Sequence, residues 1–173
     1  PSWTRTYAYD EPSLIEANKR SNRLSKAPLQ SDPPSATKDF GYDAHGNMTR
    51  MPHLPLMRWD YRDQLMATAQ QVVNNGMPET TWYTYDASGQ RVRKVTESMV
   101  SAQDAANERQ PVRLKERIYL GGFEIYREYE NDGVTPKLER ETLHVMDDKQ
   151  RIALVETKTI DTQSPVLSPQ PLI

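Results

Sequence analysis

Short runs of alternating apolar and polar residues recur along this chain. The clearest are TWYTYD at 81–86, RVRKVTE at 91–97, and the two runs RLKERIYL and FEIYREYE that flank Gly121 and Gly122. A period of two is typical of β-strands, and two glycines between two such runs predict a two-residue hairpin turn. These runs therefore predict two consecutive β-hairpins.

The pattern continues towards the C-terminus. Asn-Asp-Gly at 131–133 predicts a further turn, KLERETLHVMDD at 137–148 predicts a strand, and RIALVETKT at 151–159 predicts its partner. The fold class we predict is all-β, an antiparallel meander of about ten short strands.

A turn motif repeats within this meander. Residues 42–48 (YDAHGNM) are echoed by residues 85–91 (YDASGQR), and residues 59–65 (WDYRDQL) form a third copy in which Asp63 replaces the glycine. Residues 146–152 (MDDKQRI) are a weaker fourth copy. The repetition indicates one structural unit, strand-turn-strand, used several times.

The spacing of the motif has a direct physical account. An aspartate at the first position of a type I turn accepts backbone N–H groups of the turn, and a glycine at the fourth position adopts a left-handed conformation at low cost. The residues to which we assign this structural role are Tyr42, Asp43, Gly46, Asn47, Trp59, Asp60, Tyr85, Asp86, Gly89, Gly121, Gly122 and Asp147.

Proline-rich stretches divide the chain into three parts. Residues 1–37 read as a degenerate repeat and an irregular loop, with the alternative of a helical turn around SLIEANKR; residues 38–159 form the hairpin region; residues 160–173 form an extended tail. Residues 98–111 interrupt the hairpins as an insertion whose composition permits a short helix or a disordered tip. The chain opens in strand-like alternation without an initiator methionine, so we expect a fragment of a longer protein.

Composition and charge narrow the function classes. The 22 basic and 24 acidic residues are mixed along the chain, with a net charge of -2, so nucleic acid is not an expected partner. Hydrophobic residues make up only 36% of the chain, and the mean hydropathy of -0.84 suits sheets with a wet face. There is no cysteine, and no apolar run approaches the length of a membrane span.

The residues that suggest chemistry have simpler structural roles. The repeated aspartates could act as paired catalytic carboxylates, but their place at the start of each turn favours backbone capping. Ser88 occupies the place of His45 in the repeat, and the three histidines form no i, i+4 pair, so we expect no metal site. No Gly-x-Ser-x-Gly elbow surrounds a serine, and the Gly-Gly pair lacks the other residues of a phosphate loop. We therefore expect neither catalytic residues nor a cofactor.

Aromatic residues leave one alternative open. Eleven tyrosine, tryptophan and phenylalanine side chains, among them Trp82, lie in or beside the expected strands. They could form platforms for glycans at a cell surface, whereas packing between neighbouring strands is the simpler expectation.

The repeated units resemble the YD repeats of bacterial Rhs proteins, toxin-complex C-type subunits and animal teneurins. The resemblance rests on the Tyr-Asp units at 42 and 85, the Trp-Asp variant at 59, ERIYLGGFEIYREYE and LHVMDDKQRIALVET, and covers residues 38–159. It is most specific to the shell region just upstream of the Rhs-associated core of bacterial Rhs and insecticidal toxin-complex proteins.

The resemblance implies a fold and a role. In such proteins the hairpins join edge to edge into a β-shell around a C-terminal polypeptide, often a toxin, which implies a secreted or cell-surface bacterial protein. The expected partners are the rest of that shell, its enclosed toxin and other toxin-complex subunits, with glycans as the alternative. The family's autoproteolytic, shell-closing segment lies downstream of the matching region, and this chain has no toxin domain. Neither activity is therefore carried over to a residue of this chain, and we do not expect an enzyme.

Overall fold

The computed structural model describes residues 4–28, 40–69, 78–99 and 110–162. The described residues contain no helix, and their strands are antiparallel wherever they pair, which confirms the predicted all-β meander. The chain divides into two compact units, Pro1–Thr80 and Thr81–Ile173.

The first unit contains two short hairpins. Strand β1 (Gly41–Tyr42) pairs with β2 (Met48–Arg50), and β3 (Leu56–Trp59) pairs with β4 (Leu65–Ala69). The turns of both hairpins are repeat units. The buried side chains Met57, Ala67 and Ala69 come from the second hairpin, so the apolar packing of this unit is concentrated there.

The N-terminal segment differs from the expected helical turn. Ala8 and Lys26 form an isolated antiparallel bridge, and so do Pro12 and Arg20, so the chain runs out and back as an irregular ribbon. Asn18 lies at the bend with φ 65°, a left-handed conformation that an α-helix cannot contain. The helical turn around residues 13–20 is therefore wrong.

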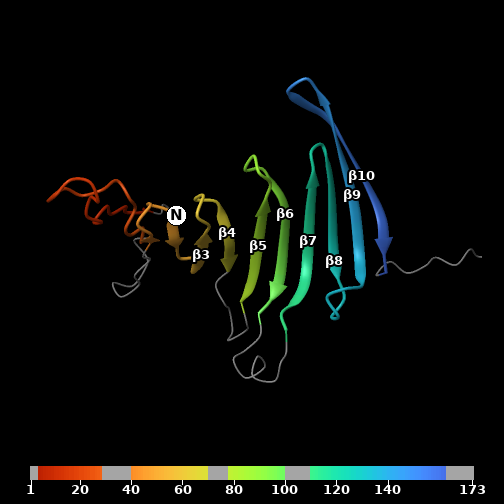
Figure 1. The fold of residues 1–173 in the computed structure, drawn as a ribbon, viewed down its shortest axis with the longest axis horizontal. Coiled ribbons are helices and arrows are strands. Elements are labelled where there is room, and N and C mark those ends of the chain that lie inside the picture. The colour runs from red at the N-terminus through yellow and green to blue at the C-terminus, as the bar shows by residue number, and fades with distance from the viewer. Residues whose placement is uncertain (1–3, 29–39, 70–77, 100–109, 163–173) are drawn as a thin grey trace, which may run out of the picture. The chain divides into compact units, whose positions relative to one another are not determined.

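The second unit carries the longer strands. They are β5 (Glu79–Tyr85), which begins at the boundary between the units, β6 (Arg91–Ser98), β7 (Val112–Leu120), β8 (Phe123–Tyr129), β9 (Pro136–Asp147) and β10 (Gln150–Asp161). They follow one another across one sheet in chain order, as Figure 1 shows. Much of the expected insertion and of the C-terminal tail lies outside the described residues.

Both faces of this sheet are rich in polar side chains. Its buried residues include Thr96, Glu116 and Thr142 as well as Val95 and Tyr129, and Gln150–Thr159 of β10 are exposed throughout. The consecutive burial of Val95 and Thr96 coincides with a register shift between Thr96 and Glu97, because a bulge turns neighbouring side chains away from strict alternation. Polar side chains therefore make up much of the buried part of this unit.

Candidate functional site

The aspartates that open the repeat units each hold a turn. Asp43 Oδ1 accepts the backbone N–H of His45 at 3.0 Å and of Asn47 at 2.8 Å. The equivalent bonds reach Asp60 from Arg62 and Gln64, at 2.8 and 2.9 Å, and Asp86 from Ser88 and Gln90, both at 2.9 Å. One carboxylate oxygen thus orders the whole turn in each copy.

The fourth position of each turn is left-handed. Gly46 has φ 91°, Gly89 has φ 85°, and Asp63 in the third copy has φ 58°. In all three turns the N–H of this residue donates to the carbonyl of the opening aspartate at 3.1 Å. The replacement of glycine by aspartate is tolerated because aspartate enters this region more readily than most residues do.

These hydrogen bonds also favour the charged form of the carboxyls. Burial opposes ionisation of Asp43, but the N–H groups of Asn47 and His45 outweigh it and lower the pKa of that carboxyl. The Ser88 hydroxyl and the turn amides lower the pKa of Asp86 in the same way. Both carboxylates are therefore charged acceptors for the N–H groups of their turns. A carboxyl that donates a proton near neutral pH needs a raised pKa, whereas the pKa of each of these groups is lowered.

The aromatic residues before these aspartates tie the hairpins to earlier segments. The Tyr42 hydroxyl donates to the Leu24 carbonyl at 3.0 Å, and Trp59 Nε1 donates to the Met48 carbonyl at 2.8 Å. Tyr85 ends β5 directly before its turn. In the first unit the aromatic-Asp pair thus combines an anchor with a turn.

Two of the repeat turns contact each other. His45 Nδ1 lies 2.8 Å from Asp63 Oδ1, and Asn47 Nδ2 donates to the same oxygen at 2.7 Å. The carboxylate raises the pKa of His45, and hydrogen bonds from His45 and Asn47 lower the pKa of Asp63. His45 therefore links successive hairpins, a role that the repeat pattern did not predict.

The remaining turns are of other types. Gly121 and Gly122 form a two-residue turn between β7 and β8, and Gly121 has φ 67°. Asp147 pairs with Gln150 across the turn of β9 and β10, where Asp148 takes the positive φ of 50°. The fourth repeat is thus shorter than the others, with Asp147 at the end of a strand.

The turn between β8 and β9 is held by Asp132. Its carboxylate accepts the N–H groups of Val134 and Thr135, both at 2.9 Å, and the Thr135 hydroxyl. Gly133 in this turn has φ 68°, and its carbonyl accepts a hydrogen bond from Arg113 Nε on β7 at 3.2 Å. This turn is therefore fastened to a strand that lies beyond β8 in the sheet.

A buried carboxylate lies at the centre of the sheet. The Glu116 side chain on β7 is only 3% exposed, and Arg93 of β6 contacts its Oε1 through Nε at 2.6 Å and Nη2 at 2.5 Å. On the other side, the Tyr129 hydroxyl of β8 donates to Oε2 at 2.5 Å, and Arg113 Nη1 lies 3.4 Å from that oxygen. The carboxylate thus receives a cation from β6, a neutral donor from β8 and a second cation, Arg113, from its own strand.

The surroundings of Glu116 stabilise its charge. Burial alone would raise the pKa of Glu116, but the hydrogen bonds from Tyr129 and Arg93 and the nearby positive charges lower it. Glu116 belongs to a row of charged side chains that crosses the sheet. Arg127 on β8 is opposite Glu116, and Glu139 on β9 is opposite Arg127 and accepts a hydrogen bond from it at 2.5 Å. This charged row joins β6, β7, β8 and β9 through side chains.

The opposite face carries a different row. Arg117, Tyr126 and Arg140 are cross-strand neighbours one residue along from the charged row, so their side chains lie on the other face. Both guanidinium groups lie over the Tyr126 ring, 5.2 and 5.0 Å from its centre. Burial and a hydrogen bond to Glu128 raise the pKa of Tyr126 to about 12, so its hydroxyl stays protonated.

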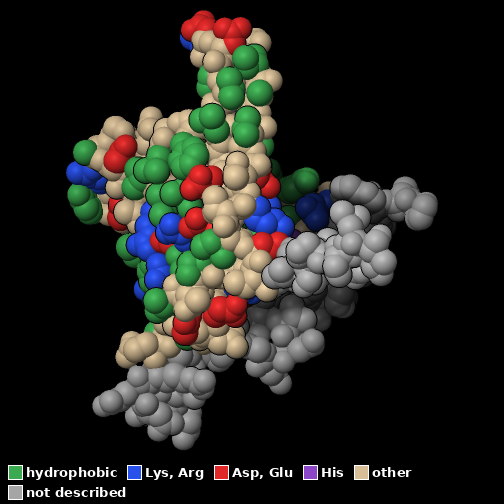
Figure 2. All heavy atoms as spheres, turned by 90° about the vertical axis from the view of Figure 1, so that its right-hand side faces the viewer, with side chains coloured by type: hydrophobic (Ala, Val, Ile, Leu, Met, Phe, Trp, Pro, Cys, Tyr) green, Lys and Arg blue, Asp and Glu red, His purple; other side chains and the backbone are tan. Residues whose placement is uncertain are grey.

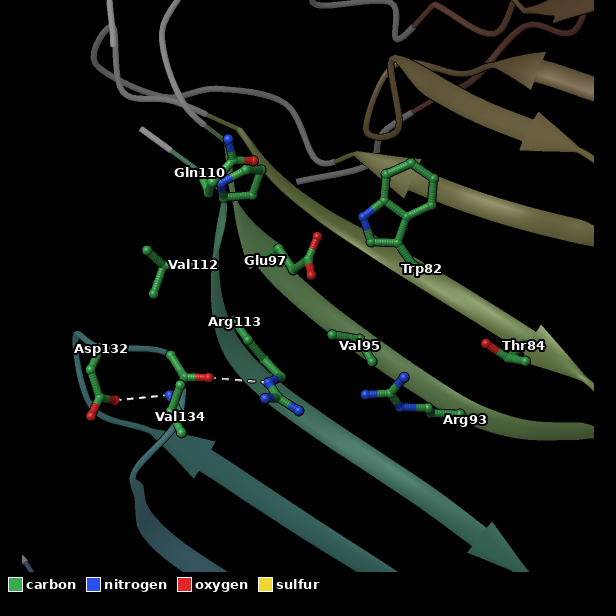
Figure 3. A pocket seen from close by; sticks show the side chains of 12 residues that line it. Trp82, Thr84, Arg93, Val95, Glu97, Gln110, Val112, Arg113, Asp132 and Val134 are labelled. Atoms are coloured by element: carbon green, nitrogen blue, oxygen red, sulfur yellow. Dashed lines mark hydrogen bonds between the residues drawn. The ribbon is translucent and has the colours of Figure 1, made fainter. Parts of the chain in front are cut away.

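A groove of about 700 Å³ opens on the same face as Glu116. Its floor and walls include Trp82, Val95, Glu97, Arg113 and Val134, which come from β5, β6, β7 and the β8–β9 turn (Figure 3). An indole beside arginine and carboxylate side chains offers an apolar surface together with hydrogen-bond donors and acceptors.

Sequence reasoning missed Glu116 and its partners, although one signal was present. Glu116 occupies the apolar stripe of β7, between Leu114 and Ile118, where a charged residue implies a buried partner.

In the described ranges, no group of three or more histidine, aspartate or glutamate side chains is placed to hold a metal ion. The same residues include no helix long and apolar enough to cross a membrane.

Comparison with known proteins shows a likeness of fold to solved structures. No family model and no curated protein matches the chain. Among solved structures it is similar to the crystal structure of TcdB2-TccC3 without hypervariable C-terminal region, with a TM-score of 0.50 and 16% sequence identity. The match covers 96% of this chain and 8% of that chain, so this chain spans a small part of its neighbour's length. At this identity the likeness is one of fold.

Proposed function

We propose that this chain is a segment of a β-shell of the Rhs and toxin-complex type, which encloses a C-terminal toxin polypeptide and helps to deliver it. The observation that carries the proposal is the meander of the second unit, a sheet of consecutive hairpins with polar side chains on both faces. Such a sheet suits a wall that meets water or a polar polypeptide on each side. The fold likeness to a toxin-complex chain supports the same role.

The proposed role is structural rather than catalytic. The aspartates of the three repeat turns accept turn amides, and Glu116 is held by an arginine and a tyrosine within the sheet. Each of these carboxylates has a local structural use. The proposed partners are the rest of the shell, its enclosed toxin and other toxin-complex subunits, in a secreted or cell-surface bacterial protein.

Protease protection in the intact parent protein tests this proposal. We expect the C-terminal toxin polypeptide to resist a nonspecific protease while the shell is whole, because a closed wall excludes the enzyme. The same polypeptide, expressed alone, is the matched control and should be digested rapidly. Equal digestion rates in the two samples would contradict enclosure.

A second candidate function is glycan binding, and the groove beside Trp82 favours it. The indole offers a flat apolar surface, and Glu97 and Arg113 line the same groove with groups that can bond hydroxyls. This function would make the sheet a recognition module at a cell surface.

Trp82→Ala tests the second candidate. On a glycan array we expect any bound glycan to be lost with Trp82→Ala and kept with Tyr61→Ala, a control at an aromatic residue that is 84% exposed and outside the groove. Thermal unfolding should show that both variants remain folded. Absence of glycan binding by the wild-type chain, or equal binding by the folded Trp82→Ala chain, would argue against this function.

A further inference from the structure

The hairpin of β9 and β10 carries a histidine between two charged side chains. His144 Nε2 lies 3.2 Å from Glu124 Oε1 on β8, and His144 Nδ1 lies 3.2 Å from Arg151 Nη1 on β10. The side chains of His144 and Glu124 are each 18% exposed. His144 on β9 therefore connects β10, the outermost strand, to β8 on the other side of β9.

The partners fix the tautomer of this imidazole. A guanidinium only donates hydrogen bonds, so Nδ1 must accept from Arg151 and the ring proton must lie on Nε2, where it donates to Glu124. Both bonds exist together only when His144 is neutral. A second proton would place an N–H group and a positive charge against Arg151, while the interaction with Glu124 would become charge-assisted.

We propose that His144 is a proton-sensitive fastener of the β9–β10 hairpin, which holds Arg151 when neutral and releases it when protonated. A second proton on the ring would replace the acceptor at Nδ1 by an N–H group, so acid would switch the contact. The result would be a looser hairpin tip, defined as residues 145–152. This regulation does not depend on which polypeptide the sheet encloses or which ligand it binds.

Few contacts hold the tip of the β9–β10 hairpin, so the loss of one contact should loosen it. It projects beyond the neighbouring strands in Figure 1, and Figure 2 shows acidic side chains at its end with apolar side chains below them. At the base of the tip the ladder of β9 and β10 shifts register between Arg151 and Ala153, and in its turn Asp148 has a positive φ of 50°. Met146 and Ile152 are more than half exposed, so little apolar packing holds the tip.

Several charged side chains surround His144 and would interact with a proton on its ring. Arg117 of β7 donates to Glu124 Oε2 at 2.5 Å and keeps that carboxylate in place. Farther along the same face of β9 and β10 lie Lys158 and the pair Arg140 and Glu156, whose charged groups are 3.4 Å apart. Glu124 and Arg151 are therefore the charges that a proton on His144 directly attracts and repels.

Amide hydrogen exchange of the 173-residue chain tests the proposal. After correction for intrinsic exchange, the tip amides should open about threefold more at about pH 5 than at about pH 7.5, the factor expected from one partly exposed pair. His144→Gln, whose amide can both donate and accept without titrating, should remove this dependence. In Arg151→Met the tip should be equally open at both pH values, and NMR should show the His144 ring taking its proton at a higher pH than in the wild-type chain.

Two results would overturn the proposal. The first is equal opening of the wild-type tip at the two pH values. The second is an unchanged ring titration in Arg151→Met, because the guanidinium would then not oppose the proton. The wild-type measurement stands alone if either variant fails to fold, and circular dichroism identifies that case.

Discussion

Replacing Glu116 with glutamine is expected to lower the free energy of unfolding by about 2 kcal/mol. Glutamine keeps the size of the side chain but removes the charge, so Arg93 and Arg113 lose the carboxylate that they share. The loss falls short of that for a fully buried pair, because these arginine side chains are 45% and 31% exposed and can be rehydrated. Denaturant unfolding of the 173-residue chain measures the change.

A matched control separates burial from charge. Glu156→Gln also breaks a carboxylate-arginine pair, but the Glu156 side chain is 47% exposed, so its loss should stay within about 0.5 kcal/mol. Similar small losses for both variants would show that the buried pair does not hold the sheet.

The effect of Glu116→Gln should also depend on pH. The pKa of Glu116 is lowered from its ordinary value of 4.5 in the folded chain, so its contribution is fully present above that value and is lost as the pH falls through the folded pKa. The wild-type and variant stabilities should therefore converge in acid. Protonation of the turn carboxyls Asp43 and Asp86 in acid lowers the stability of the wild-type and variant chains equally. It therefore leaves the difference in stability between the two chains unchanged.

Gly133→Ala is expected to lower the free energy of unfolding by about 3 kcal/mol. A Cβ at this position would lie 3.0 Å from the backbone N of Arg113 and 3.0 Å from Val112 Cγ1, and φ is already 68°. Backbone strain and a collision with the start of β7 therefore act together. Thermal or denaturant unfolding gives the magnitude.

Gly46→Ala is the control that carries strain without collision. Gly46 has φ 91°, and no atom lies within 4 Å of the position that a Cβ would take. Its loss should be about 1 to 2 kcal/mol, the cost of a left-handed conformation for a residue with a side chain. If the two variants lose the same stability, the contact between the β8–β9 turn and β7 is not tight.

The features within reach of sequence are local ones. In the turn at Asp43, every bond of the carboxylate to backbone N–H groups lies within four residues, so the order of residue types already specifies the geometry. The same holds for the Gly121-Gly122 pair, which lies between two alternating runs and of which Gly121 has the positive φ of the turn. Such features need no knowledge of which strands become neighbours.

The features that sequence missed depend on register. Glu116 meets Arg93 and Tyr129 only because β7 lies between β6 and β8 with that alignment, and a shift of one residue would send the carboxylate to the other face. The contact of His45 with Asp63 likewise requires two turns to lie side by side. The helical turn around residues 13–20 was wrong because Asn18 is left-handed there, although the composition permits such a turn.

A cryo-electron microscopy map of the intact parent protein would show whether this chain is part of an enclosing wall. We expect β5 to β10 to form one continuous stretch of wall, with one face turned to a closed cavity and the other to bulk solvent. A map in which both faces of this sheet meet bulk solvent, or in which a second folded layer covers the face of Glu116, would contradict enclosure.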